Sequence, residues 1–151
     1  MNNINKVIFA SGSGTSRAPM AAAIFRSVPS QRPISCEARG LIVQFPEPLN
    51  QKADAVLISN GIELTDYSST QLQDSDFSEN TLVITMEETQ RQKILSEYTN
   101  ATEDNTRLLN ELVGDELEIM DPYGGSVQTY GLCYEVLKAS IEKLMRVLET
   151  N

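Results

Sequence analysis

Residues 7–20 read VIFASGSGTSRAPM, which is the pattern of a strand, a loop and a helix in succession. The uninterrupted apolar run from Val7 to Ala10 is typical of a central parallel strand, because both faces of such a strand are covered. Six small residues and Arg17 follow this run. The alanine-rich segment from Pro19 predicts a helix, since proline is favoured in a first helical turn.

The loop between this strand and helix has the composition of an anion site. N–H groups at a helix start lack an intrahelical acceptor, and the helix dipole adds partial positive charge. We expect positive φ angles at Gly12 and Gly14, which would turn successive N–H groups inward. Arg17 adds a planar fork suited to phosphate. The predicted phosphate-binding residues are Ser11, Gly12, Ser13, Gly14, Thr15, Ser16 and Arg17.

The composition of this loop is compatible with other structures. A tight strand-to-helix turn with a surface arginine would have a similar composition, because small residues are common in turns. A nucleotide-binding Walker loop is excluded, because the Lys-Ser/Thr ending is missing.

Composition limits the partners and the chemistry. The chain has 21 acidic and 12 basic side chains, and its net charge of −9 argues against nonspecific binding to nucleic acid or anionic membrane. No apolar run reaches the roughly 18 residues of a membrane span. The N-terminus does not resemble a signal peptide, so we expect a cytoplasmic protein. Histidine is absent, which removes Ser-His and Cys-His catalysis and histidine metal sites; we expect no metal and no cofactor.

The rest of the chain alternates predicted strands and helices. Strands are expected over 5–10, 33–36 and 81–86, with a short last strand within 107–112. Helices are expected from Pro19 and over 48–60, 87–98 and 127–148. The last helix has an apolar stripe at spacings of three and four: Val127, Tyr130, Tyr134, Leu137, Ile141, Leu144 and Leu148. This alternation predicts a parallel sheet covered on both faces, in one domain over 1–151. Cys36 and Cys133 are expected to be buried reduced thiols.

Another apparent motif lies further along the chain. Asp74–Ser78 reads DSDFS, which mimics the haloacid-dehalogenase phosphatase signature. That chemistry needs the first aspartate at the end of a buried strand, and the preceding residues 70–73 are too polar. We therefore predict a solvated helix start or turn there.

Over essentially its whole length, the chain resembles the low-molecular-weight protein tyrosine phosphatases. Their loop runs Cys, five residues, Arg, Ser, Pro, Met directly after the first strand, and residues 11–20 fill that frame with Ser11 and Arg17 at the two ends. Their Asp-Pro-aromatic motif is matched by Asp121–Ser126. Two further segments resemble the family, namely Gly61–Leu64 with Ser69–Leu72, and Met86–Glu88.

The resemblance implies a fold and a set of roles. The fold is a three-layer α/β sandwich with a central four-stranded parallel sheet, flavodoxin-like in class. In the family a thiolate attacks phosphorus, the arginine and loop amides hold the phosphoryl oxygens, and the aspartate protonates the leaving group. This places Ser11 at the nucleophile position, Arg17 at phosphate and Asp121 as general acid, with Thr15 and Tyr123 contacting substrate. Asp121 is alternatively a turn residue before Pro122.

Thr15 bears on the substrate. Most tyrosine-directed members carry a bulky aliphatic residue at this position, whereas members resembling the protein-arginine phosphatases carry threonine. Phosphotyrosine and phosphoarginine proteins are therefore both candidate substrates. A threonine that simply suits a small-residue loop is the alternative.

The loop departs from the family at five positions: Ser11 replaces the cysteine, Ser13 a glycine, Gly14 an asparagine, Ser16 a second cysteine and Ala18 a serine. A serine nucleophile needs a base, and Asp121 must stay protonated as the acid. We predict little or no turnover, with retained binding of phosphorylated protein or of phosphate and sulfate anions, by a monomer or weak dimer.

A protein of another class has a similar loop. The spacing Ser11-x-Ser13-Gly14-x-Ser16 resembles the flavodoxin loop that binds the FMN phosphate, which would make the chain an electron carrier. Arg17 is not needed there, and the chain has no tryptophan to stack on the flavin, although Tyr67, Tyr123 or Tyr130 could take that place. Flavin absorbance of the purified protein separates the two hypotheses.

Overall fold

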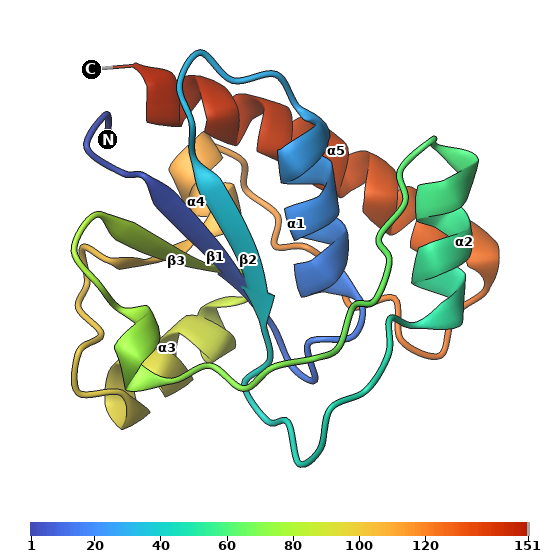
Figure 1. Ribbon diagram of the computed structural model, residues 1–151, viewed down its shortest axis with the longest axis horizontal. Coiled ribbons are helices and arrows are strands. Elements are labelled where there is room, and N and C mark those ends of the chain that lie inside the picture. The colour runs from blue at the N-terminus through green and yellow to red at the C-terminus, as the bar shows by residue number, and fades with distance from the viewer. Residues whose placement is uncertain (151) are drawn as a thin grey trace.

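A computed structural model describes residues 1–150 as an α/β sandwich built on one parallel sheet (Figure 1). The strands are β1 (Lys6–Ala10), β2 (Ser35–Arg39), β3 (Thr81–Thr85) and β4 (Thr106–Leu108), in the order β2-β1-β3-β4. All three pairings are parallel. Ala10 lies level with Arg39 and Thr85, so three strands end at one edge, where the loop after β1 begins.

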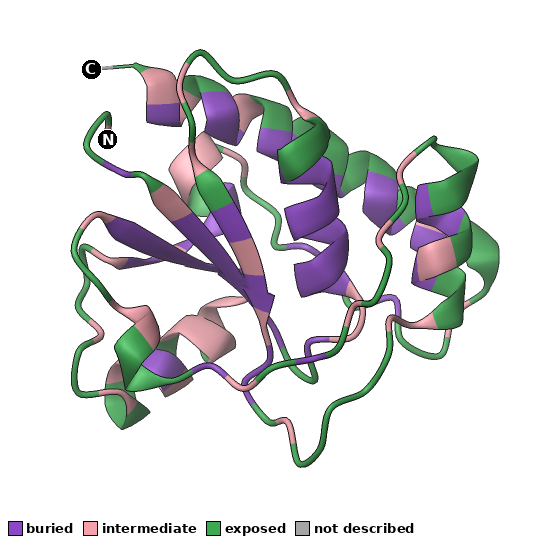
Figure 2. Ribbon diagram, viewed as in Figure 1, coloured by how far each residue is buried: buried purple, intermediate pink, exposed green. Residues whose placement is uncertain are grey.

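The helices cover both faces of the sheet. They are α1 (Arg17–Ser27), α2 (Gln51–Ser59), α3 (Glu88–Glu97), α4 (Leu109–Val113) and α5 (Val127–Glu149), with a 3₁₀ turn η1 (Asp74–Asp76). In β1, Val7 and Phe9 pack with α1 and α5, whereas Ile8 packs with Ile94 of α3 on the other face. This burial on both faces explains the unbroken apolar run, and Figure 2 shows β1 and β3 buried along most of their length. The three-layer fold with four parallel strands is confirmed.

The predicted stripe of α5 is largely confirmed. Its side chains from Tyr130 to Leu148 are buried against α1, α2 and α4, but Val127 is 48% exposed because the first turn extends beyond the core. Ser126 caps this helix by accepting a hydrogen bond from the Thr129 N–H at 3.2 Å. No helix in residues 1–150 is long and apolar enough to cross a membrane.

Two strand predictions require correction. The short last strand predicted within 107–112 is present but lies at the start of that stretch, because β4 ends at Leu108 and the chain turns into α4. Leu109, Leu112 and Val113 have helical spacing and face the core, and Gly114 ends the helix at a φ of +80°. The second strand begins at Ser35, because Pro33 has no N–H for the ladder, and it continues to Arg39.

Other local predictions hold. The segment after Gln73 forms the 3₁₀ turn η1 with no buried residue, as expected for a solvated turn. Cys36 and Cys133 are both buried and unpaired. Pro19 lies in the first turn of α1.

Gly40, directly after β2, permits the closest packing against the loop. A Cβ atom there would lie 2.8 Å from the backbone C and O of Ser13 and 2.5 Å from Val43 Cγ2. Gly40→Ala is therefore expected to lower the free energy of unfolding by about 1–3 kcal/mol. Gly131→Ala is the matched control, since its Cβ meets open space in α5 and should raise stability by about 0.5–1 kcal/mol. Urea unfolding checks both; equal stability of Gly40→Ala and the wild type would contradict the packing argument.

Candidate functional site

The loop from Ser11 to Ser16 joins β1 to α1 and lines an open hollow of about 180 Å³. A water molecule takes about 30 Å³ in the liquid, so a phosphoryl group and part of its substituent have room there. The hollow brings together every residue that the sequence predicted for the site: Ser11, Gly12, Ser13, Gly14, Thr15, Ser16, Arg17, Asp121 and Tyr123.

Carbonyl groups of the loop are turned away from the hollow by backbone donors outside it. Gly12 O accepts hydrogen bonds from Leu41 N at 2.7 Å and Ile42 N at 3.1 Å. Thr15 O accepts one from Asn50 N at 2.9 Å. Because carbonyl and N–H groups of one planar peptide point in opposite directions, the following N–H groups face the hollow.

These N–H groups are unpaired within the described chain. No backbone or side-chain acceptor in residues 1–150 binds the N–H of Gly12, Ser13, Thr15, Ser16 or Arg17. Converging free N–H groups at the first turn of a helix form an anion site. The cradle predicted from composition therefore has the required donors.

Only one of the two predicted positive φ angles is present. Gly14 has a φ of +74°, whereas Gly12 is not in the left-handed region. Gly14 N donates to Ser11 O at 3.0 Å, so the chain makes a turn over residues 11–14. Glycine is favoured at the fourth position of such a turn, which explains why Gly14 alone is left-handed.

Ser11 lies at the floor of the hollow with 4% of its surface exposed. Its Oγ accepts a hydrogen bond from Ala18 N at 3.1 Å, which satisfies an otherwise free N–H at the start of α1. Among residues 1–150, no carboxylate or amine hydrogen-bonds to this hydroxyl. The hydroxyl proton therefore remains free to donate to a bound anion, and no base is placed to remove it.

Arg17 is buried beside the hollow, with 5% of its side chain exposed. Its Nη1 donates to Ile119 O at 2.7 Å. Its Nη2 lies 2.7 Å from the Glu87 carboxylate and 3.8 Å from that of Asp121. These contacts fix the guanidinium and partly balance its charge.

Glu87 is a site residue that was predicted only as part of the family-like segment Met86–Glu88, with no role in the site. It lies two residues after the end of β3 and caps α3, so its carboxylate lies at the same sheet edge as the loop. Ligands of open α/β sheets bind at the carboxyl ends of the strands. Glu87 and Glu88 form an acidic pair just after a buried strand. Applied to this pair, the rule would have predicted that Glu87 belongs to the site.

Asp121 and Tyr123 form the opposite rim. The Asp121 side chain is 55% exposed, and its Oδ1 accepts a hydrogen bond from Tyr123 N at 3.1 Å, as in an Asx turn. Its other oxygen lies on the Arg17 side. Asp121 thus has both the turn role and a place in the site, which were predicted as alternatives. Tyr123 is 83% exposed.

Neither cysteine is a substitute nucleophile. Burial raises the pKa of the Cys133 thiol to about 11, although Arg17 acts in the opposite direction. Burial also raises the pKa of Cys36 in β2. A thiol is nucleophilic as its thiolate, so both groups are inert near neutral pH. Within residues 1–150, no group of three His, Cys, Asp or Glu side chains could hold a metal ion.

A parallel α/β sandwich with an anion cradle at its strand ends and an aspartate on the rim is the arrangement expected of a phosphatase-type site. Residues 6–151 match the family described as low molecular weight phosphotyrosine protein phosphatase. The chain belongs to this family, and the resemblance drawn from its motifs is confirmed. The match supports the phosphatase-like interpretation over the FMN-binding electron carrier.

Relatives in this family have two named activities. A low molecular weight protein-tyrosine-phosphatase, PtpB of Staphylococcus epidermidis, is 28% identical over 139 residues, covering 92% of this chain and 96% of the relative. A protein-arginine-phosphatase of Geobacillus stearothermophilus is 26% identical over 147 residues, covering 97% of each. A solved structure of the YwlE arginine phosphatase, 26% identical, has a TM-score of 0.87 and covers 97% of both chains. That protein is a cysteine-to-serine mutant whose active-site serine is phosphorylated.

Glu87→Gln tests how the charge on Arg17 is balanced. The amide keeps an acceptor but loses the negative charge, so phosphate should bind about two- to fivefold more tightly. Without phosphate, the free energy of unfolding should fall by about 1–2 kcal/mol, because a charge-assisted bond to a buried guanidinium is weakened. Calorimetric titration and urea unfolding measure the two effects.

Glu88→Gln is the matched control for this variant. Glu88 is the next residue, and its carboxylate pairs with Arg91 at 3.1 Å instead of Arg17. Phosphate affinity should be unchanged in this control. Weaker phosphate binding by Glu87→Gln would show that the carboxylate holds Arg17 in place more than it competes with the anion.

Proposed function

We propose that this chain binds phosphorylated side chains of proteins through residues 11–17 and hydrolyses them slowly or not at all. The observation that carries the proposal is the set of unpaired N–H groups that surround Ser11 beside the buried Arg17. Preorganised donors of this kind stabilise a phosphoryl group whether or not it is transferred. Asp121 is proposed as the residue that would face the leaving group.

Impaired turnover follows from the environment of Ser11. Its hydroxyl accepts the Ala18 N–H, and no base among the described residues takes its proton. A serine becomes an effective nucleophile only beside a base, and Asp121 as the general acid is not available for that role in the same step. In the arginine phosphatase relative, a serine at the active site carries a phosphoryl group. We therefore propose that Ser11 contacts, and in a slow transfer would retain, the phosphoryl group.

Two hydroxyl groups in the wall of the hollow favour phosphoarginine over phosphotyrosine. Ser13 Oγ and Thr15 Oγ1 lie 2.7 Å apart and both line the hollow. A guanidinium would donate hydrogen bonds to these hydroxyls, whereas a phenyl ring would shield them from water without replacing those bonds. Phosphorylated proteins of the cytoplasm are the proposed partners, and the relatives named as arginine and tyrosine phosphatases support both substrate classes.

Anion binding should be visible as stabilisation. Phosphate or sulfate should raise the melting temperature, because a ligand that binds only the folded state adds about 2.7 kcal/mol at 100 times its Kd. Arg17→Ala should remove most of this shift. Arg146→Ala is the control, since Arg146 is exposed on α5 and should leave the shift unchanged. An undiminished shift in Arg17→Ala would place the anion elsewhere.

Turnover is tested with p-nitrophenyl phosphate and a phosphoarginine peptide. The wild type should release little or no product, and Ser11→Cys should gain measurable activity, because free N–H groups and Arg17 favour a thiolate. Asp121→Asn in the Ser11→Cys background should reduce that activity by about 10²-fold or more. Intact mass of the wild type after incubation reports any phosphoryl group retained on Ser11. Fast wild-type turnover would contradict the proposal.

A further inference from the structure

One carbonyl of the phosphate loop is held by a side chain. The Tyr67 hydroxyl donates to Gly14 O at 2.6 Å, across 53 residues of sequence. Elsewhere in the loop, the carbonyls of Gly12 and Thr15 bind backbone N–H groups. Within residues 1–150, Tyr67 is the one side chain that hydrogen-bonds to a carbonyl of residues 11–16.

This bond controls a donor of the cradle. Gly14 C=O and Thr15 N–H belong to the same planar peptide and point in opposite directions. A hydroxyl that holds the carbonyl outward therefore holds the Thr15 N–H toward the hollow. The preceding residue is a left-handed glycine, with a φ of +74°, and glycine restricts its own backbone least. This peptide consequently depends on an outside contact for its orientation.

We propose that Tyr67 is a positioning residue for phosphate binding, which acts by fixing the Gly14–Thr15 peptide with its N–H in the anion site. The inference rests on the proposed function, because it assigns a role in phosphate binding at the same loop. It adds a residue that does not itself line the hollow.

The segment that carries Tyr67 is itself firmly placed. Gly40 N donates to Thr70 O at 2.8 Å, and Leu72 N donates to Gly40 O at 2.9 Å, so residues 70–72 lie alongside the end of β2. Ser69 N donates to Glu47 O at 2.8 Å, so the same segment is also bound to the chain between β2 and α2. Tyr67 therefore presents its hydroxyl from a segment that is tied to the same backbone as the loop.

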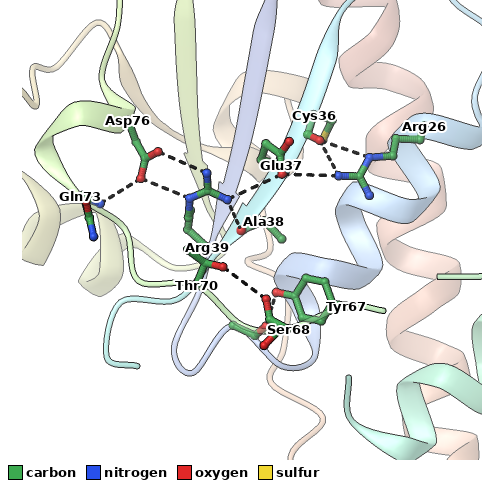
Figure 3. A network of polar contacts seen from close by, with 11 residues as sticks. Arg26, Cys36, Glu37, Ala38, Arg39, Tyr67, Ser68, Thr70, Gln73 and Asp76 are labelled. Atoms are coloured by element: carbon green, nitrogen blue, oxygen red, sulfur yellow. Dashed lines mark hydrogen bonds and ion pairs between the residues drawn. The ribbon is translucent and has the colours of Figure 1, made fainter. Parts of the chain in front are cut away.

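A network of charged side chains also holds the end of β2 in place. Figure 3 shows the Arg39 guanidinium between the carboxylates of Asp76 and Glu37, with Arg26 beyond Glu37. The Arg39 carbonyl accepts the Ser11 N–H at 3.2 Å, so this network also fixes the start of the loop. The half-buried Tyr67 lies close to it in the same view.

The hydroxyl is present as a donor at any ordinary working pH. Burial raises the pKa of Tyr67 to about 12, and this effect outweighs the opposite influence of Arg39 and Arg26. The phenol therefore stays protonated, and its proton is available to Gly14 O.

Tyr67→Phe removes this hydroxyl and leaves the ring. In ¹⁵N-labelled wild type, phosphate should shift the amide proton of Thr15 downfield together with that of Ser16. In Tyr67→Phe, the Thr15 response should be lost or at least halved while the Ser16 response remains. The Kd for phosphate should rise about fivefold, the effect of one neutral hydrogen bond.

Tyr134→Phe is the control, because it makes the same change of side chain away from the loop. Tyr134 is buried in α5 and does not line the hollow, whereas the hydroxyl of Tyr98 bonds to Gln71 and Leu72 of the segment that carries Tyr67. Tyr134→Phe should keep the wild-type phosphate affinity and Thr15 response. If Tyr67→Phe shows the same Thr15 shift and the same Kd for phosphate as the wild type, the positioning role of Tyr67 is overturned, but the proposed function is not. If phosphate shifts no amide signal of the loop in the wild type, both the proposed function and the role of Tyr67 are overturned.

Discussion

The orientation of the peptide groups between Ser11 and Arg17 is the constraint on which the site depends. Carbonyls of this loop are bound from outside, by Leu41, Asn50 and Tyr67, and this turns the N–H groups toward one hollow. Gly40 allows the close approach of β2 that brings these donors near. The cradle is therefore made by the surroundings of the loop as much as by its own small residues.

A buried guanidinium requires compensation, and the site supplies it with Glu87, Asp121 and the Ile119 carbonyl. Desolvation of an unpaired charge is costly, so these contacts maintain Arg17 next to the hollow before any ligand binds. The same carboxylates reduce the positive potential offered to an anion. The balance between holding Arg17 and competing with phosphate sets the affinity of the site.

Much of the site follows from local sequence. The strand, the loop and the helix of residues 7–27 are encoded by neighbouring residues. The motif that contains Asp121 is likewise recognisable from the six residues 121–126. The features that escaped prediction depend on distant contacts. Tyr67 meets Gly14 across 53 residues, and Glu87 reaches Arg17 only because β3 lies beside β1. The exact bounds of the short β4 were not predictable, because its pairing with β3, and not its composition, ends it at Leu108.

The most direct test of this account is a crystal structure of the chain grown with inorganic phosphate. The account predicts a phosphate ion in the hollow over Ser11, within hydrogen-bond distance of the N–H groups of residues 12–17 that are unpaired here and beside Arg17. A loop without phosphate while the ion occupies another surface would contradict it.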